Sequence, residues 1–425
     1  MMHDRYDNPI STTSEKARDA YIKGVDALLS ANAGAELEFQ KAINADESFA
    51  LAYAALARAF QISGRGVEAT ASIAKAESLS DGASTRELSH IAMLGHLIGG
   101  RGADAVASAR AHVMEFPRDT MIVQPLTSVF GLIGFSGLAG REAEQLAFLT
   151  TLAPSYGDDW WFNCQFAFAQ VEVGQTDRAW NTITKSLDGN PRNAHAAHIR
   201  THIHYERDDA KAGLIYLTDW YKDLDRKAVL HCHITWHLAL WNLEFGNSEQ
   251  AWAYIDDGVR PSKAWGPALN VMTDTASFLH RAEMCGEDVD VARWREVSEY
   301  ALNFFPNRGF TFADIHAALA HAMVGETDTL GQLISDAKGP AADVVAKLAE
   351  AFQAFVAENW QAVIAHLTPV MSQHERVGGS RAQRDLIEFT MLAALMKLGR
   401  ADDARLMLAT RRPMKTDYGV SIGLG

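Results

Sequence analysis

The sequence has 425 residues, enough for two or three globular domains or for one long repeat array. Its formal charge of −14 at pH 7 argues against nucleic acid or an anionic membrane surface as the main partner, because both favour basic proteins. The odd number of widely spaced cysteines predicts buried thiols in a reducing compartment, which we take to be the cytoplasm.

Residues 1–12 are polar, and we expect them to form a flexible N-terminus ahead of the folded chain. The longest apolar stretch covers residues 121–140. It contains Gln124, Pro125 and four glycines, a composition that does not suit a membrane-spanning helix. We expect it to be a buried helix that ends in a loose turn, and we expect no membrane partner.

A glycine followed five residues later by an alanine recurs along the chain. Glycine supplies the positive φ that ends one helix, and the small residue lets the next helix pack closely against it. The spacing indicates a repeat of about 34 to 36 residues, which is typical of stacked helical hairpins. The pairs are Gly64/Ala69, Gly100/Ala105, Gly174/Ala179, Gly246/Ala251 and Gly399/Ala404.

One complete unit spans residues 50–83. Tyr53, Leu56 and Phe60 fall on one face of its first helix, a pattern that resembles tetratricopeptide repeats. Strand signals are almost absent. We therefore predict an all-α, tetratricopeptide-like superhelix, an α-solenoid of about eleven helical hairpins. The first helices of the hairpins are expected near 14–30, 48–63, 84–98, 120–136, 159–173, 194–207, 230–245, 268–285, 310–324, 341–358 and 381–398.

No linker rich in proline, glycine or serine interrupts this periodicity. Residues 13–412 are therefore predicted to form a single continuous superhelical domain. Residues 413–425 form a C-terminal tail, either loose or folded back as a cap. The side chains that could bind a ligand or a metal, or act in catalysis, are concentrated in the units around 158–330, where we expect a pocket.

Seven of the sixteen histidines lie between residues 195 and 237. The repeat phase turns one group of side chains from two consecutive first helices toward the same concave groove, with His237 beside them. This group consists of His195, His198, His202, Glu206, His233 and Trp236.

Two pairs of histidines in this group, His198/His202 and His233/His237, have a spacing of four residues. This spacing places their Cβ atoms about 5–6 Å apart on one helix face, where two imidazoles can chelate a divalent metal. A helical zinc protease would also need a glutamate directly after the first histidine, and isoleucine follows in both pairs. The protease interpretation is therefore excluded.

Three functions fit the histidine group. The first is binding of a small polar ligand or a short peptide in the concave groove, with the imidazoles as donors and Trp236 as an apolar wall. The second is an enzyme of hydrolase or lyase type that uses the imidazoles as a metal site or as general acid and base, oriented by Glu206 or Asp274. The third is an interaction scaffold whose groove is filled by its own tail. It also stays open whether the histidines are purely structural. Whether the protein forms an oligomer is likewise open.

The segments "HIRTHIHYERDDAKAGLIYL" (198–217), "HCHITWHLALWNLEFGNSEQAW" (231–252) and "FADIHAALAHAMVGETD" (312–328) give a narrower resemblance. Together with "FPRD" (116–119), they resemble the tetratricopeptide repeat protein 38 family in order and spacing. Tyr205 stands where that family commonly has a carboxylate, and Glu206 follows it. The resemblance selects His198, His202, Cys232, His233, Trp236, His237, Asp274 and His316 as the residues of the site.

Overall fold

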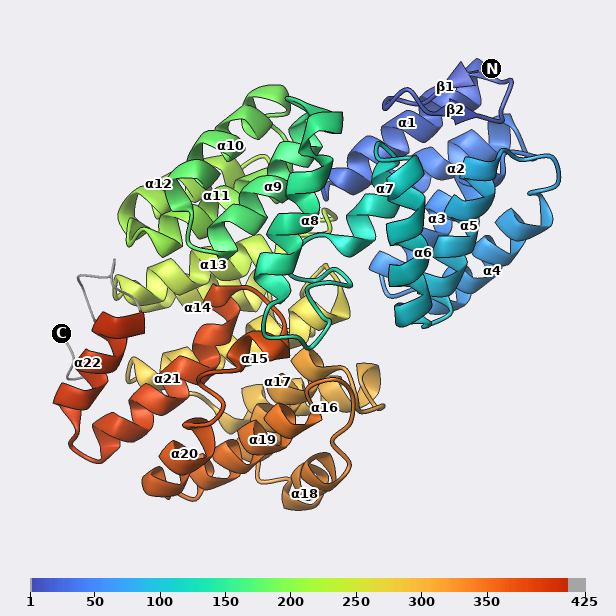
Figure 1. Cartoon of the computed structure of the whole chain (residues 1–425). Helices are drawn as coiled ribbons and strands as arrows, with labels where there is room; N and C mark the ends of the chain where they lie inside the picture. Colours follow the sequence, from blue (N-terminus) through green and yellow to red (C-terminus); the bar gives the residue numbers. More distant parts are fainter. Residues whose placement is uncertain (1, 412–425) are drawn as a thin grey trace.

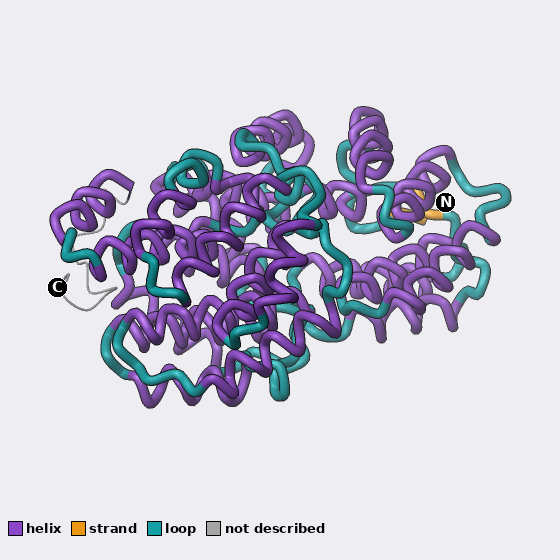
Figure 2. The backbone as a smooth tube through the Cα atoms, turned by 90° about the horizontal axis from the view of Figure 1, so that it is seen from below, coloured by secondary structure: helices purple, strands orange, loops and turns teal. Residues whose placement is uncertain are grey.

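The computed structural model describes residues 2–411, and this part of the chain contains 22 α-helices. Taken two by two they form eleven consecutive pairs, which stack into a tetratricopeptide-like superhelix (Figure 1). The predicted all-α fold class is confirmed. Helices dominate the backbone, and the short hairpin near the N-terminus supplies the strands (Figure 2).

The first helices of the pairs lie close to their predicted positions. They are α1 (Glu15–Leu29), α3 (Ala50–Ile62), α5 (Thr85–Ile98), α7 (Thr120–Val123), α9 (Trp160–Glu172), α11 (Ala194–Glu206), α13 (His231–Glu244), α15 (Ala268–Met284), α17 (Thr311–Met323), α19 (Ala342–Val356) and α21 (Arg381–Lys397).

The second helix follows after a short turn in most pairs. These helices are α2 (Ala35–Ala45), α4 (Gly66–Ser78), α6 (Gly102–Glu115), α8 (Arg141–Tyr156), α10 (Thr176–Gly189), α12 (Ala210–Tyr221), α14 (Ser248–Gly258), α16 (Val291–Phe304), α18 (Thr327–Ser335), α20 (Trp360–Leu367) and α22 (Ala401–Arg411).

The glycine and alanine pairs have the geometry that the repeat requires. Gly64, which ends the hairpin turn between α3 and α4, has a φ of +76°, and Gly246 between α13 and α14 has a φ of +71°. A side chain is strained in this left-handed conformation, so glycine is favoured there. Each of the five paired alanines is 0% exposed, because the second helix packs closely against its partner there: Ala69, Ala105, Ala179, Ala251 and Ala404.

The fourth unit departs from the predicted helix over 120–136. Helix α7 continues only into a 3₁₀ turn, η1 (Gln124–Leu126), and turns follow up to α8. Pro125 supplies no backbone donor, and Ser128 adopts a φ of +66°. At Gly131 an added Cβ would lie 2.0 Å from the Thr127 carbonyl oxygen, so the turn can close only around glycine. The expectation of a longer helix was therefore wrong.

The N-terminal residues also differ from the flexible segment expected for residues 1–12. Strand β1 (Met2–His3) pairs with β2 (Pro9–Ile10) in an antiparallel hairpin. Tyr6 and Ile10 are buried, and Arg5 forms an ion pair with Asp159 at 2.7 Å. The predicted C-terminal tail, 413–425, lies outside the described residues.

The superhelix closes on itself through α21. Figure 1 shows the C-terminal helices curling back beneath the central units. Arg384 of α21 forms an ion pair with Glu142 of α8 at 2.5 Å, and Arg381 forms one with Glu206 of α11 at 3.0 Å. Every residue from Ala382 to Leu395 is buried. Helix α21 therefore occupies the interior of the superhelix rather than its end.

Two simple properties complete the fold. Within residues 2–411 no helix combines the length and apolar character needed to cross a bilayer. All three cysteines are free thiols: Cys164 and Cys232 are buried, and Cys285 is half-buried.

Candidate metal centre

Two neighbouring first helices, α11 and α13, carry the four central histidines. Helix α11 begins at its N-cap Asn193, whose side chain accepts a hydrogen bond from the Ala196 backbone N–H at 3.1 Å. In α13, every residue from His231 to Leu243 is buried. A spacing of four residues places both histidines of each helix on one face, and the two faces meet.

The four imidazoles converge on one point. His198, His202, His233 and His237 each offer one ring nitrogen, and these nitrogens all lie within 4.8 Å of one another. The Nε2 atoms of His198 and His202 are 2.8 Å apart. Between the helices, the ring centroids of His198 and His233 are 4.7 Å apart, and those of His202 and His237 are 4.8 Å apart. The sequence predicted this set of four residues as candidate metal ligands.

Asp274, on α15, holds the outer nitrogen of one of these rings. Its Oδ2 atom lies 2.7 Å from Nδ1 of His233, and the side chain of Asp274 is 1% exposed. A carboxylate on Nδ1 fixes the ring orientation and leaves Nε2 free to face the other three histidines. The structure thus brings Asp274 to the site as a supporting residue.

Aromatic rings enclose the four histidines. Trp236 stacks on His233, with ring centroids 5.1 Å apart and planes 16° apart. Phe168 of α9 contacts His202 from the other side, with centroids 5.3 Å apart. Arg281 lies between Trp236 and Phe389 of α21, 5.5 Å and 5.0 Å from their ring centres. Trp236 is therefore packed between the four histidines and Arg281, and α21 lies behind it.

The environment favours neutral imidazoles. Burial holds the pKa of His198, His202 and His237 well below the usual value, and neighbouring imidazoles add to this effect. A neutral imidazole keeps the lone pair through which a metal is bound. Nδ1 of His198, Nδ1 of His202 and Nε2 of His237 are buried and have no hydrogen-bond partner within the described chain.

Two other candidates do not join the four histidines. Glu206, expected as a carboxylate ligand or base, forms an ion pair with Arg381. His316 of α17 donates its Nδ1–H to the Phe312 carbonyl oxygen at 2.7 Å. Burial lowers the pKa of His316 to about 4. Both residues are thus engaged by neighbours outside the centre.

Two residues beside the four histidines, His195 and Cys232, have ordinary packing partners. His195 contacts Gln165, with its Nδ1 atom 3.0 Å from Nε2 of the amide. Cys232 is fully buried, its Sγ atom lies 3.9 Å from the Val259 carbonyl oxygen, and burial raises its thiol pKa well above the usual range. A thiol in this state is a packing residue rather than a nucleophile.

Sequence reasoning did not find a second buried cluster around Asp119. This carboxylate lies 2.5 Å from Nη1 of Arg86, 2.9 Å from Nδ1 of His90 and 3.1 Å from Nε2 of His112. The two imidazoles and the Arg86 guanidinium hold the pKa of Asp119 well below its usual range, against the effect of burial, which raises it. His90 and His112 come from different helices and share no motif, so no spacing pointed to them.

Comparison with known proteins gives the following matches. No protein-family model matches the chain. The human IFIT1 dimer with m7Gppp-AAAA is similar over 96% of both chains, with 11% identity and a TM-score of 0.46. Yeast Tom70 is similar over 95% of this chain and 93% of its own, with 13% identity and a TM-score of 0.36. The tetratricopeptide domain of P58(IPK) is similar over 91% of this chain and 99% of the P58(IPK) chain, with 14% identity and a TM-score of 0.21.

Proposed function

We propose that this chain is a tetratricopeptide-like protein that binds one divalent transition-metal ion between α11 and α13. The observation that carries this proposal is the convergence of four ring nitrogens within 4.8 Å of one another. Zinc bound to histidine has a metal–nitrogen distance of 2.0–2.1 Å, so a tetrahedral ion needs its ligand nitrogens about 3.3 Å apart. Small side-chain movements are enough to bring the four nitrogens to that separation.

The chemistry of the donors supports a late first-row ion. Imidazole nitrogen suits zinc, copper, nickel and iron, whereas calcium and magnesium prefer oxygen ligands. Four neutral imidazoles do not neutralise the positive charge of the ion. The carboxylate of Asp274 contributes negative charge close to the site, because it is hydrogen-bonded to the ligand His233. We therefore place zinc or a neighbouring divalent ion in the site, with His198, His202, His233 and His237 as ligands and Asp274 as the supporting carboxylate.

Direct binding of a small polar ligand or short peptide by these imidazoles has less support. The four histidines are 1–4% exposed, and their rings face one another. A ligand would have to separate these rings before it could bind. Metal-assisted hydrolase or lyase chemistry remains compatible with the centre. Because Glu206 pairs with Arg381, Glu206 is not the base of our proposal.

The remaining parts of the proposal concern family, extent and location. We propose kinship with the tetratricopeptide repeat protein 38 family, because the quoted segments 198–217 and 231–252 supply all four converging histidines. A single continuous superhelix over 13–412 is supported by the contacts of α21 with α8 and α11. The free thiols support a reducing, cytoplasmic location.

Elemental analysis tests the metal proposal directly. Protein purified without an affinity tag, dialysed against zinc and then against buffer alone, should contain about one metal ion per chain. The double variant His233→Ala/His237→Ala should retain almost none. His3→Ala/His96→Ala, which alters two histidines away from the centre, should bind as the unaltered chain does. No bound zinc, cobalt, nickel or copper in the unaltered chain would contradict the proposal.

A further inference from the structure

The joint between the sixth and seventh units, where α11 meets α13, is built differently from the joints on either side of it. The backbones of α9 and α11 approach each other closely, and so do those of α13 and α15. The backbones of α11 and α13 lie farther apart. The imidazoles of His198, His202, His233 and His237 fill the space between these two helices.

The apolar core is also divided at this joint. One cluster of buried apolar side chains ends on α11, with Ile199 and Ile203. Another begins on α13, where it includes Trp236, and continues through the later units. A smaller cluster beside α12, which includes Leu217 and Ile234, is shared by the two units. Polar imidazoles thus stand where the neighbouring units have apolar contacts, so hydrophobic burial contributes less to this joint.

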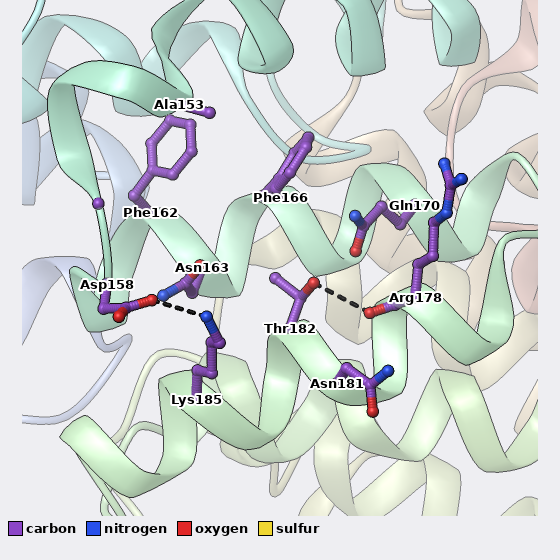
Figure 3. A pocket seen from close by; sticks show the side chains of 11 residues that line it. Ala153, Asp158, Phe162, Asn163, Phe166, Gln170, Arg178, Asn181, Thr182 and Lys185 are labelled. Atoms are coloured by element: carbon purple, nitrogen blue, oxygen red, sulfur yellow. Dashed lines mark hydrogen bonds and ion pairs between the residues drawn. The ribbon is translucent and has the colours of Figure 1, made fainter.

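The four histidines are closed to solvent. Each is only 1–4% exposed, and Phe168 and Trp236 pack against their rings. Neither the groove of about 370 Å³ between α8, α9 and α10 (Figure 3) nor the small cavity beside Tyr6 is lined by any of them. Catalytic zinc keeps one coordination position for water or substrate, whereas structural zinc has four protein ligands. Four converging, buried imidazoles match the structural type.

The two carboxylates that could have served a metal-assisted reaction have other partners. Glu206 forms its ion pair with Arg381 of α21, and Oδ2 of Asp274 accepts a hydrogen bond from Nδ1 of His233. A metal-bound water or substrate would need a nearby acid or base with which to exchange a proton. The contact of Asp274 instead ties α15, in the eighth unit, to the same centre.

We propose that the bound ion is a structural clamp, which joins α11 to α13 where the apolar core is interrupted. This inference rests on the proposed function, because it assigns a role to the ion bound there. The hydrogen bond between Nε2 of His198 and Nε2 of His202 lies within α11, and the described residues show none between the four rings across the joint. With two ligands from each helix, the ion supplies the attraction that apolar contacts supply at the neighbouring joints.

Hydrogen exchange of the whole chain, with and without bound zinc, tests this role. At a free zinc concentration about 100 times the Kd, amides of α11 and α13 that exchange by separation of the two units should exchange about 100-fold more slowly. Amides of α3, in the second unit, should not change, because each unit of a stacked array contacts mainly its neighbours. His233→Ala/His237→Ala should show no effect of zinc, and His3→Ala/His96→Ala should respond as the unaltered chain does.

A second measurement tests the coordination of the ion. In the cobalt-loaded chain, four histidine ligands should give the visible absorption of a tetrahedral ion, and added azide should leave this spectrum unchanged. A spectral change with azide would show an open coordination position and overturn the structural role. One bound ion per chain with unchanged exchange of α11 and α13, or with equal slowing in α3, would also overturn it. Absence of bound metal would contradict the proposed function and this inference together, so the two kinds of failure are distinguishable.

Discussion

Asp274 and His233 are joined by a hydrogen bond of 2.7 Å between Oδ2 and Nδ1, although 41 residues separate them in the sequence. The contact links α15 to α13 and determines which nitrogen of His233 faces the other three imidazoles. A carboxylate in this position also makes the opposite nitrogen a stronger ligand. In the proposed metal site, Asp274 would bear on metal affinity while lying outside the set of ligands.

Asp274→Asn should lower metal affinity by about 10- to 100-fold, the usual cost of altering such a supporting carboxylate. Asparagine has a similar shape and can still accept the His233 Nδ1–H, but it carries no negative charge. Competition with a chromogenic chelator measures the affinity. Unfolding of the metal-free chain, measured in parallel, separates this effect from a general loss of stability.

A matched control for this change is Asp257→Asn. Asp257 is an exposed carboxylate on α14 that pairs with Arg226. The control should retain the zinc affinity of the unaltered chain. If Asp274→Asn also retains it, Asp274 does not support the metal.

The repeat architecture could be predicted from the sequence because five units carry the same local pattern, a glycine that ends one helix and an alanine five residues later that is buried under the next. Ten helical pairs follow the phase that these five units set. The fourth unit does not. Its course depends on contacts with distant segments, such as Phe130 against Phe312 with ring centroids 5.5 Å apart, and no local pattern encodes those contacts.

The candidate site could be predicted only in part, for a related reason. Two histidines four residues apart on the first helix of each of two consecutive units give the four imidazoles directly. Phe168 and Arg281, which enclose them, are ordinary residues in sequence and acquire their roles through packing. Glu206 appeared suitable as a ligand by position, but closure of the superhelix brings Arg381 to it instead. The repeat pattern does not predict contacts between units that are far apart in the chain.

Glu172, at the end of α9, contacts α21, where its Oε2 atom accepts a hydrogen bond from the Arg381 backbone N–H at 3.2 Å. We therefore expect the closure of the superhelix to depend on the protonation of Glu172. Burial raises the pKa of Glu172 to about 7, and this effect outweighs the attraction of Arg384. The unfolded chain releases this proton near pH 4.5, so between about pH 4.5 and 7 the folded chain holds a proton that the unfolded chain has lost. The contribution of Glu172 to the free energy of unfolding therefore falls as pH rises through this window.

Glu172→Gln removes this titration. Relative to the variant, the unaltered chain should lose about 1–3 kcal/mol of unfolding free energy between about pH 5 and pH 8. Urea unfolding of both proteins at the two pH values measures the difference. Glu249→Gln, at an exposed position of α14, should follow the unaltered chain at both. Parallel pH profiles for Glu172→Gln would show that this carboxyl does not titrate with the closure.

The packing phase of the hairpins can be tested within one helix. Ala69 of α4 is 0% exposed against α3, whereas Ala74 of the same helix faces solvent. Ala69→Leu adds three carbon atoms to a filled interface and should cost about 1–3 kcal/mol of unfolding free energy. Ala74→Leu has the same change in helix propensity and no neighbour to displace, so its effect should stay within about 0.5 kcal/mol.

In a stacked array each unit contacts mainly its neighbours, so the same substitution at Ala179 of α10 should carry a similar cost. Ala179 is likewise 0% exposed and follows its turn glycine, Gly174, by five residues. Thermal unfolding of the variants measures all three effects. If Ala69→Leu and Ala74→Leu shift the unfolding temperature equally, close helix packing is not what requires alanine at this position of the repeat.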